Sequence, residues 1–215
     1  MTAVDACLEV DTERASIPLS TANRLSYACE MTGDDDSLLM LRYAKHDDVN
    51  AFETLYRRHK DGVYRYLLRH CNQAEAAEDI FQEVWGKIVR SRGNYRPSAK
   101  FNTFLYRVAH NCFIDYLRRN TRHSRGVEFS DESTPAGDES PETSTERSLA
   151  RQRLREGLRT LPDEQRDAFL LHEEGGLSVE QIAKVTGVNR ETAKSRLRYA
   201  VAKLKTALAE KGSAA

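Results

Sequence analysis

The sequence predicts an all-α protein made of two small helical domains joined by a flexible acidic linker, with a helix-turn-helix in the C-terminal domain. Apolar residues recur at three- and four-residue spacing through most of the chain from residue 37 onward, and no segment shows the apolar–polar alternation of a strand. Residues 126–146 interrupt this pattern with two prolines, two glycines, seven acids and almost no large apolar side chain. Such a composition cannot bury enough surface to offset chain entropy, so we expect this segment to be the linker.

The first domain is predicted over residues 34–125, as a compact bundle of helices. Asn72 and Glu75 have the spacing of a capping box, in which each side chain accepts a hydrogen bond from the backbone near the other, and they predict the start of a helix. Residues 91–98 include Gly and Pro and break the helical period, so a loop is expected there. A further helix is expected over about 101–119.

The second domain is predicted over residues 147–211. Pro162 suits the first turn of a helix, where its missing N–H would have no intrahelical partner. Ser178 and Gln181 repeat the capping-box spacing at the start of another helix. Four short helices are therefore expected, at about 148–159, 162–173, 179–185 and 190–209.

Residues 178–197 have the form of a helix-turn-helix. Ala183 is small where the two helices cross, Gly187 supplies the backbone freedom of the turn, and Asn189 can cap the second helix. One face of that second helix is apolar, and the other carries Arg190, Glu191, Thr192, Lys194, Ser195 and Arg198. Such a face suits the major groove of DNA, where N-terminal side chains reach base edges and flanking cations hold phosphates. An ordinary helical hairpin with a solvated basic face is the alternative.

Length and hydropathy indicate a cytoplasmic protein without membrane insertion. The chain has 215 residues, enough for one or two small domains. Its longest apolar runs are a few residues, such as 169–171, against about 18 needed to span a bilayer, and its N-terminus lacks the pattern of a signal peptide. Residues 1–33 have no clear period and an acidic balance, which predicts a disordered N-terminal extension. Met31 is an alternative start of translation.

The formal net charge is zero, but the charges are sorted along the chain. Residues 87–125 carry ten basic groups and one acidic group, for a net +9, and residues 186–215 carry seven and two, for a net +5. Residues 1–36 carry a net −6 and the linker a net −7. Two separated basic blocks indicate two contacts with a polyanion in one chain.

The first basic block is interleaved with aromatic residues, among them Tyr95, Phe101 and Phe104. Cations next to rings suit single-stranded nucleic acid, because phosphates follow the charges while unstacked bases lie on the rings. Taken residue by residue, the alternative is that the rings belong to the core and that the cations solvate the end of a helix.

The sequence predicts neither an enzyme nor a cofactor. The four cysteines are far apart, without a C-x-x-C pair or a His at zinc-ligand spacing, and no phosphate-binding loop is present. Asp79, Glu83, His110 and Asp115 are the candidates for acid–base chemistry, but they contain no visible set of nucleophile, base and orienting group. Reduced cytosolic thiols are the expectation for the cysteines.

Four motifs in order carry a family resemblance. They are AEDIFQEVW at 77–85, FNTFLYRVAHN at 101–111 followed by Asp115 and Arg118, Leu161-Pro162 with Arg166, and TAKSRL at 192–197. The chain resembles the extracytoplasmic function (ECF) sigma factors, group IV of the sigma-70 superfamily, over about residues 34–210. The resemblance implies that the chain binds RNA polymerase core and gives it promoter specificity, as part of a bacterial stress response. It names promoter DNA as a partner, double-stranded at the −35 element and single-stranded at the −10 element. An anti-sigma factor is a further expected partner.

The resemblance also assigns roles to residues. The side chains expected to dock on the clamp coiled coil of the large catalytic subunit are Glu78, Asp79, Gln82 and Glu83. Those expected to open and read the −10 element are Tyr95, Lys100, Phe101, Asn102, Arg107, Asn111, Asp115, Arg118, Arg119 and Arg122. The helix-turn-helix face given above is expected to read the −35 element.

Two residues depart from the family pattern. Phe104 stands where the family usually has Trp, and Phe can still pack or stack. His110 stands where the family usually has Arg, which puts a phosphate contact at that position in doubt. An autonomous helix-turn-helix regulator is the alternative function, and the basic block at 91–125 argues for the sigma factor because a free-standing repressor would not need it.

Overall fold

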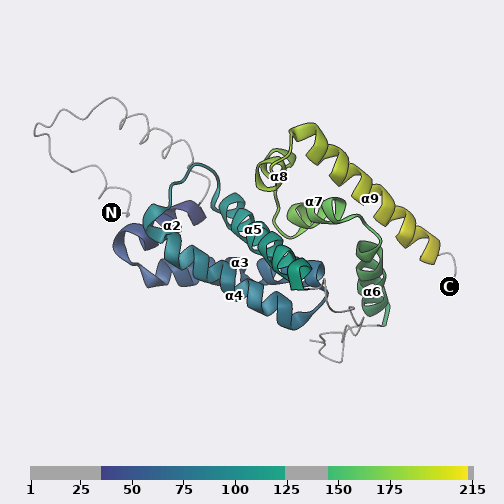
Figure 1. The fold of residues 1–215 in the computed structure, drawn as a ribbon, viewed down its shortest axis with the longest axis horizontal. Helices are drawn as coiled ribbons and strands as arrows, with labels where there is room; N and C mark the ends of the chain where they lie inside the picture. The colour runs from purple at the N-terminus through teal and green to yellow at the C-terminus, as the bar shows by residue number, and fades with distance from the viewer. Residues whose placement is uncertain (1–34, 124–144, 213–215) are drawn as a thin grey trace, which may run out of the picture. The chain divides into compact units, whose positions relative to one another are not determined.

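The structure is a computed structural model that describes residues 35–123 and 145–212, and the all-α prediction is confirmed (Figure 1). Within those two ranges the regular structure is helical, without a strand. From Asp36 onward the chain clusters as one compact unit, so the two predicted helical domains are packed together. The expectations for the N-terminal extension and Met31, and for the linker up to residue 144, lie outside the described residues.

The first domain contains α2 (Asp35–His46), α3 (Val49–Cys71), α4 (Ala74–Ser91), the short 3₁₀ helix η2 (Arg92–Asn94) and α5 (Phe101–His123). Helix α3 begins after Asp48, whose carboxylate accepts a hydrogen bond from the Ala51 N–H at 3.1 Å. Helix α4 packs against both α3 and α5. Fully buried side chains such as Leu55, Ile80 and Leu105 form the core between these helices. The loop expected at 91–98 is present, and η2 lies within it.

The predicted capping box at Asn72 is wrong. Asn72 ends α3 instead of starting α4: it has a left-handed φ of 55°, and its N–H donates to the Leu68 carbonyl at 2.9 Å. Helix α4 then starts after Gln73, which makes no side-chain cap. Asn tolerates the left-handed conformation better than most residues, so Asn72 forms the C-terminal cap of α3 in place of the N-terminal cap of α4.

The second domain contains α6 (Thr145–Arg159), α7 (Asp163–Glu173), α8 (Val179–Thr186) and α9 (Arg190–Gly212). Helix α6 therefore begins within the last two residues of the predicted linker. Pro162 lies one position before α7, at its N-cap. Helix α9 packs against the other three helices, around buried side chains that include Leu170, Ile182 and Leu204.

The helix-turn-helix forms as its local signals predict. The Gln181 N–H donates to Ser178 Oγ at 3.4 Å and the Ser178 N–H donates to Gln181 Oε1 at 2.8 Å, which completes the capping box of α8. Gly187 has a φ of 72°, the left-handed conformation that the turn requires. Asn189 Oδ1 accepts from the Thr192 N–H at 2.7 Å and so caps α9.

Among the described helices, none combines the length and the apolar character needed to cross a bilayer. The main contacts between the two domains run from α3 to α7 and from α5 to α8, and His110 of α5 also contacts Asp167 of α7. These contacts bring part of the predicted −10 surface against the second domain.

Candidate nucleic-acid interface

The exposed face of α9 carries the residues predicted to read double-stranded DNA. Arg190, Glu191, Lys194 and Arg198 are exposed, and Thr192 and Ser195 are half-buried beside them. On the opposite side Ala193, Ala200 and Leu204 are buried, while Leu197 and Val201 are half-buried. Because the apolar side holds α9 against its own domain, the polar side is held outward along the first turns of the helix.

Two of the cations on this face have partners in the second domain. Arg190 Nε lies 2.6 Å from Glu180 Oε1, and Arg190 Nη1 lies 3.1 Å from Glu191 Oε1. The hydrogen bond from Arg190 lowers the pKa of Glu180 to about 2, so this pair is charged at neutral pH. The Arg198 guanidinium lies 5.0 Å from the centre of the Tyr199 ring, and Tyr199 is 52% exposed. Tyr199 was not predicted, although its place beside Arg198 is visible in the sequence.

The residues predicted to read the −10 element divide into two groups. On the surface, Lys100, Arg107, Asn111, Arg118 and Arg119 are exposed and Asp115 is half-buried. Arg122 belongs to α5, but its side chain lies outside the described part. Two of these cations have acidic neighbours, since Arg118 lies 3.6 Å from Asp115 and Arg119 lies 2.9 Å from Glu83.

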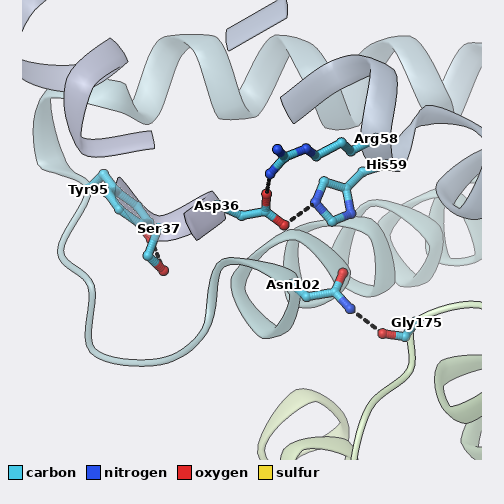
Figure 2. A network of polar contacts seen from close by, with 7 residues as sticks. All are labelled: Asp36, Ser37, Arg58, His59, Tyr95, Asn102 and Gly175. Atoms are coloured by element: carbon cyan, nitrogen blue, oxygen red, sulfur yellow. Dashed lines mark hydrogen bonds and ion pairs between the residues drawn. The ribbon is translucent and has the colours of Figure 1, made fainter. Parts of the chain in front are cut away.

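Two predicted aromatic contacts, Tyr95 and Phe101, are buried. The Tyr95 hydroxyl donates to Ser37 Oγ at 3.3 Å (Figure 2). The Tyr95 ring lies 5.2 Å from that of Phe104. Phe101 is completely buried, with its ring 5.4 Å from the imidazole of His59. In this conformation both rings pack within the first domain, and a base could reach them only after a local rearrangement.

Asn102 and Arg107 contact the second domain. The Asn102 amide donates to the Gly175 carbonyl, as Figure 2 shows, and Arg107 Nη2 donates to the Lys184 carbonyl at 3.3 Å. Next to them, Thr103 Oγ1 accepts from Gln181 Nε2 at 2.8 Å. The start of α5 is therefore bound to α8 and to the loop that precedes it.

The acidic face of α4 carries the residues predicted to dock on polymerase. Glu78, Asp79 and Gln82 are exposed. Glu83 is partly buried, and its carboxylate lies 2.9 Å from Lys87 Nζ and 2.9 Å from Arg119 Nη2. Burial raises the pKa of Glu83, but the hydrogen bonds from Lys87 and Arg119 outweigh that effect and hold it below its ordinary value. Glu83 thus links this acidic face to the cations of α5.

His110, whose role was in doubt, contacts an acid of the second domain that the sequence did not single out. Its Nδ1 lies 3.2 Å from Asp167 Oδ2, and His70 Nε2 lies 3.3 Å from Asp167 Oδ1. The Tyr66 hydroxyl donates to Asp167 Oδ1 at 2.7 Å. Asp167 and Tyr66 are about a hundred residues apart, and the sequence gives no signal that joins them.

The residues weighed for acid–base chemistry have separate partners. His110 contacts Asp167, Glu83 contacts Lys87 and Arg119, and Asp115 lies 3.6 Å from Arg118. In the part of the chain that the structure covers, no group of three His, Cys, Asp or Glu residues could hold a metal ion.

Two of the four cysteines, Cys71 and Cys112, lie in the described ranges, and both are free thiols. Burial raises the pKa of the Cys71 thiol to about 12. Burial also raises the pKa of Cys112, although the nearby Lys87 ammonium opposes the shift. Neither thiol has the lowered pKa that marks a reactive cysteine.

Comparison with known proteins assigns the family. The model of Sigma-70 region 2 matches residues 55–123, and the model of Sigma-70, region 4 matches residues 151–204. The two matches together span more than half of the chain, in the order that the motifs predicted. The chain belongs to the sigma-70 family of RNA polymerase sigma factors. Helices α2–α5 are called region 2 below, and helices α6–α9 are called region 4.

Relatives of this sigma factor include ECF members. The ECF RNA polymerase sigma factor SigE of Mycolicibacterium smegmatis is 34% identical over 76% of this chain, which spans 63% of the length of SigE. The RNA polymerase sigma factor CarQ of Myxococcus xanthus is 32% identical over 75% of this chain and 91% of CarQ. The sigma factor RpoE of Bartonella quintana, solved in complex with the anti-sigma factor NepR, has a TM-score of 0.62 at 22% identity, over 73% of this chain and 96% of RpoE. That last likeness concerns the fold.

Proposed function

We propose that this sigma factor is an ECF, group IV member that binds RNA polymerase core and directs initiation at its own promoters in the bacterial cytoplasm. The observation that carries the proposal is the presence of two cationic helix faces, on α5 and α9, in two different domains. One such face would serve a repressor, whereas two separated faces suit a promoter with two elements.

The face of α9 is proposed to read the −35 element as duplex DNA. Arginine pairs well with guanine, and Glu191 can accept from the N4 amine of cytosine. Lys194 and Arg198 are proposed to hold phosphates, since both are exposed about one turn apart on the same face. The helix-turn-helix geometry supports this assignment, because it holds the N-terminal end of α9 outward.

Region 2 is proposed to open and read the −10 element without hydrolysing a nucleotide. Separating DNA costs about 1.4 kcal/mol for each base-pair step in stacking. Each base captured on an aromatic wall returns roughly 1–3 kcal/mol. A few captured bases together with duplex contacts upstream can therefore offset a short bubble, and the cations along α5 supply the phosphate contacts.

The acidic face of α4 is proposed to dock on the clamp coiled coil of the large catalytic subunit. Glu78, Asp79 and Gln82 are exposed on neighbouring turns, so a basic partner helix could contact all three together. An anti-sigma factor is a further proposed partner, because the RpoE of Bartonella quintana was solved bound to one.

Transcription in vitro with core polymerase that lacks sigma tests the function. Adding the full chain should produce transcripts that start at defined sites on DNA upstream of the genes that respond to its overproduction. Binding to that DNA without core, and no promoter-specific transcript with it, would favour an autonomous regulator.

Asp79→Arg tests the docking surface. This change should weaken core binding and transcription at least about tenfold, because a charge reversal in a charged interface costs several kcal/mol. DNA binding by the full chain to a duplex −35 element should stay unchanged. Glu53→Arg is the matched control, since Glu53 is an exposed acid on α3 outside the docking face. Equal effects of the two changes on core binding would count against a docking site on α4.

A further inference from the structure

Helix α2 is linked to both ends of the loop between α4 and α5. Residues 92–100, called the −10 loop below, include Tyr95 and Lys100 and lead directly into Phe101 at the start of α5. We propose that α2, together with Asp47 after it, positions this loop, so that its exposed turn meets single-stranded DNA in one preformed conformation. The inference rests on the proposed −10 role of region 2, and all the contacts that carry it lie within region 2.

Arg92 joins the start of the −10 loop to the end of α2. Its Nη2 lies 2.8 Å from Asp47 Oδ1, and its Nη1 donates to the Tyr43 hydroxyl at 3.1 Å. Tyr43 is itself fixed, because it is 5% exposed and its ring lies 4.7 Å from that of Phe52 on α3. The guanidinium of Arg92 is therefore turned toward α2, and we assign it to holding the loop and not to a phosphate contact.

Asp47 has a backbone conformation that suits this contact. Its φ of 52° lies in the left-handed region, which few residues other than glycine adopt and which Asp enters more readily than most. A residue keeps such a conformation when its surroundings over-determine it. Because the Asp47 side chain is 72% exposed, its ion pair with Arg92 adds little stability. Its contribution is to the direction of the Arg92 side chain.

Tyr95 joins the middle of the −10 loop to the first turn of α2. Its hydroxyl donates to Ser37 Oγ at 3.3 Å, and Tyr95 and Ser37 are 5% and 4% exposed (Figure 2). A buried hydroxyl is costly without a hydrogen bond, so this contact favours one position of the loop on α2. The Tyr95 N–H also donates to the Arg92 carbonyl at 3.1 Å, which links the two attachments.

Phe101, just after the −10 loop, is linked to α2 through His59. Asp36 Oδ2 lies 2.8 Å from His59 Nε2, and Asp36 Oδ1 accepts from Arg58 Nη1 at 2.6 Å, as Figure 2 shows. The His59 ring lies 5.4 Å from the Phe101 ring, and Phe101 is completely buried. Asp36 therefore fixes the imidazole that packs on Phe101, and both ends of the loop depend on α2.

The part of the loop between these attachments forms a tight turn on the surface. The Ser98 N–H donates to the Arg96 carbonyl at 2.8 Å across Pro97, whose ring fixes φ near the value of an inverse γ-turn. Arg96 Nη1 donates to the Tyr95 carbonyl at 3.0 Å. Arg96, Ser98 and Lys100 are exposed, so polar groups for a DNA strand lie on a turn whose ends are fixed. A preformed turn binds with a smaller loss of conformational freedom than a mobile loop would.

Arg92→Lys in the full chain is the first test. Lysine keeps the charge but lacks the planar fork that reaches Tyr43 and Asp47 together, so the loop should loosen. Backbone hydrogen exchange over 92–100, followed by mass spectrometry, should become at least about threefold faster. Bound to core polymerase, the variant should bind a fluorescent single-stranded oligonucleotide with the −10 sequence of a promoter mapped by the transcription assay. That binding should be at least about threefold weaker than in the wild type, because apparent affinity scales with the fraction of molecules in the binding conformation. A phosphate contact by Arg92 would instead survive the change to Lys.

Asp47→Gly is a second test, in which charge and positioning predict opposite results. Glycine suits the left-handed backbone and removes the carboxylate. The loss of an acid should by itself strengthen binding to DNA, whereas the loss of the Arg92 attachment should weaken binding to the −10 oligonucleotide. We expect weaker binding and faster exchange over 92–100. Asp61→Ala is the matched control, since it makes the same charge change at an exposed position in the middle of α3, and its loop exchange should match the wild type.

The outcomes separate the steps of the proposal. Wild-type exchange over 92–100 in both variants would overturn the positioning of the loop by α2. Faster exchange with wild-type oligonucleotide binding would overturn its role in reading the −10 element. Equally weakened binding to a −35 duplex would also overturn the proposal, because the effect would not be confined to the loop. If the wild type with core polymerase gives no promoter-specific transcript, the sigma assignment fails, and faster exchange in both variants still supports the positioning of the loop.

Discussion

The two proposed DNA-reading surfaces differ in how far their residues are exposed in the free chain. On α9 of region 4, Arg190, Glu191, Lys194 and Arg198 are all exposed in the free chain. On region 2, Tyr95 and Phe101 are buried, and Asn102 and Arg107 contact region 4. One surface can meet its target as it stands, whereas the other must first rearrange.

This difference follows the form of the two targets. Duplex DNA offers a groove of fixed shape, so a helix held outward by its apolar side is a sufficient reader. Single-stranded DNA is bound by rings and cations that would also attract any other strand. On the proposed −10 role of these groups, keeping them covered would limit binding to DNA away from polymerase. The comparison teaches that the −10 surface is the one whose activity depends on conformation.

Among the changes that test this difference, Phe101→Ala should have the largest effect on the free energy of unfolding. Phe101 is fully buried, and removing such a ring costs about 3–5 kcal/mol of unfolding free energy. Urea unfolding of the full chain should show this loss, with a smaller loss for the half-buried Phe104→Ala. Equal stability of Phe101→Ala and the wild type would mean that the Phe101 ring is a surface group held ready for a base.

Asp167→Asn should have the next largest effect. It keeps the shape of the side chain but removes the charge that Tyr66 donates to, and hydrogen bonds to charged groups contribute about 1.5–3 kcal/mol. Urea unfolding should show a loss of that size. Glu164→Gln, an exposed position on the same helix, is the control and should unfold at the wild-type midpoint. A loss no greater than that of the control would make the contact between α7 and region 2 a minor one.

The same carboxylate predicts how stability depends on pH. Burial raises the pKa of Asp167, but the hydrogen bonds and charges of His110 and His70 more than reverse that effect, so its pKa lies well below the ordinary value of about 3.9. A lowered folded-state pKa stabilises the protein above the unfolded-state pKa, and that contribution is lost as the pH falls below about 5. The difference in unfolding free energy between wild type and Asp167→Asn should therefore shrink from pH 5 to pH 3. A constant difference over that range would contradict the assignment.

Lys194→Ala should have the smallest effect, confined to DNA binding by the exposed face of α9. Each phosphate contact contributes about −0.9 to the slope of log affinity against log salt for duplex DNA, so the variant should lose about that much slope on a −35 duplex. Arg198→Ala should behave alike. Lys203→Ala, an exposed cation farther along α9, is the control. An unchanged slope in the first two variants would remove both residues from the DNA interface.

Local signals in the sequence predicted local structure well. The capping box of Ser178 and Gln181, the turn at Gly187 and the cap at Asn189 all involve groups within a few residues, and all formed as expected. Asn72 failed for an equally local reason, because an Asn beside a helix boundary suits either the end of one helix or the start of the next.

Long-range contacts could not be predicted in this way. The buried positions of Tyr95 and Phe101 depend on Ser37 and His59, which lie 58 and 42 residues earlier. The approach of Glu174 to Arg65 spans 109 residues. Glycine positions give a partial signal: a Cβ at Gly62 would lie 3.2 Å from the Glu174 carbonyl oxygen, and one at Gly175 would lie 3.3 Å from the Tyr106 ring.

The partly buried Cys71 thiol has a practical consequence for anyone who labels this protein. Burial raises the pKa of Cys71 to about 12, so its thiolate is scarce at neutral pH and maleimide and iodoacetamide reagents will modify it slowly in the folded chain. Alkylation of Cys71 therefore reports unfolding at the end of α3. Cys71 follows His70, which contacts Asp167. Pulsed alkylation of Cys71 therefore measures how fast that part of region 2 opens.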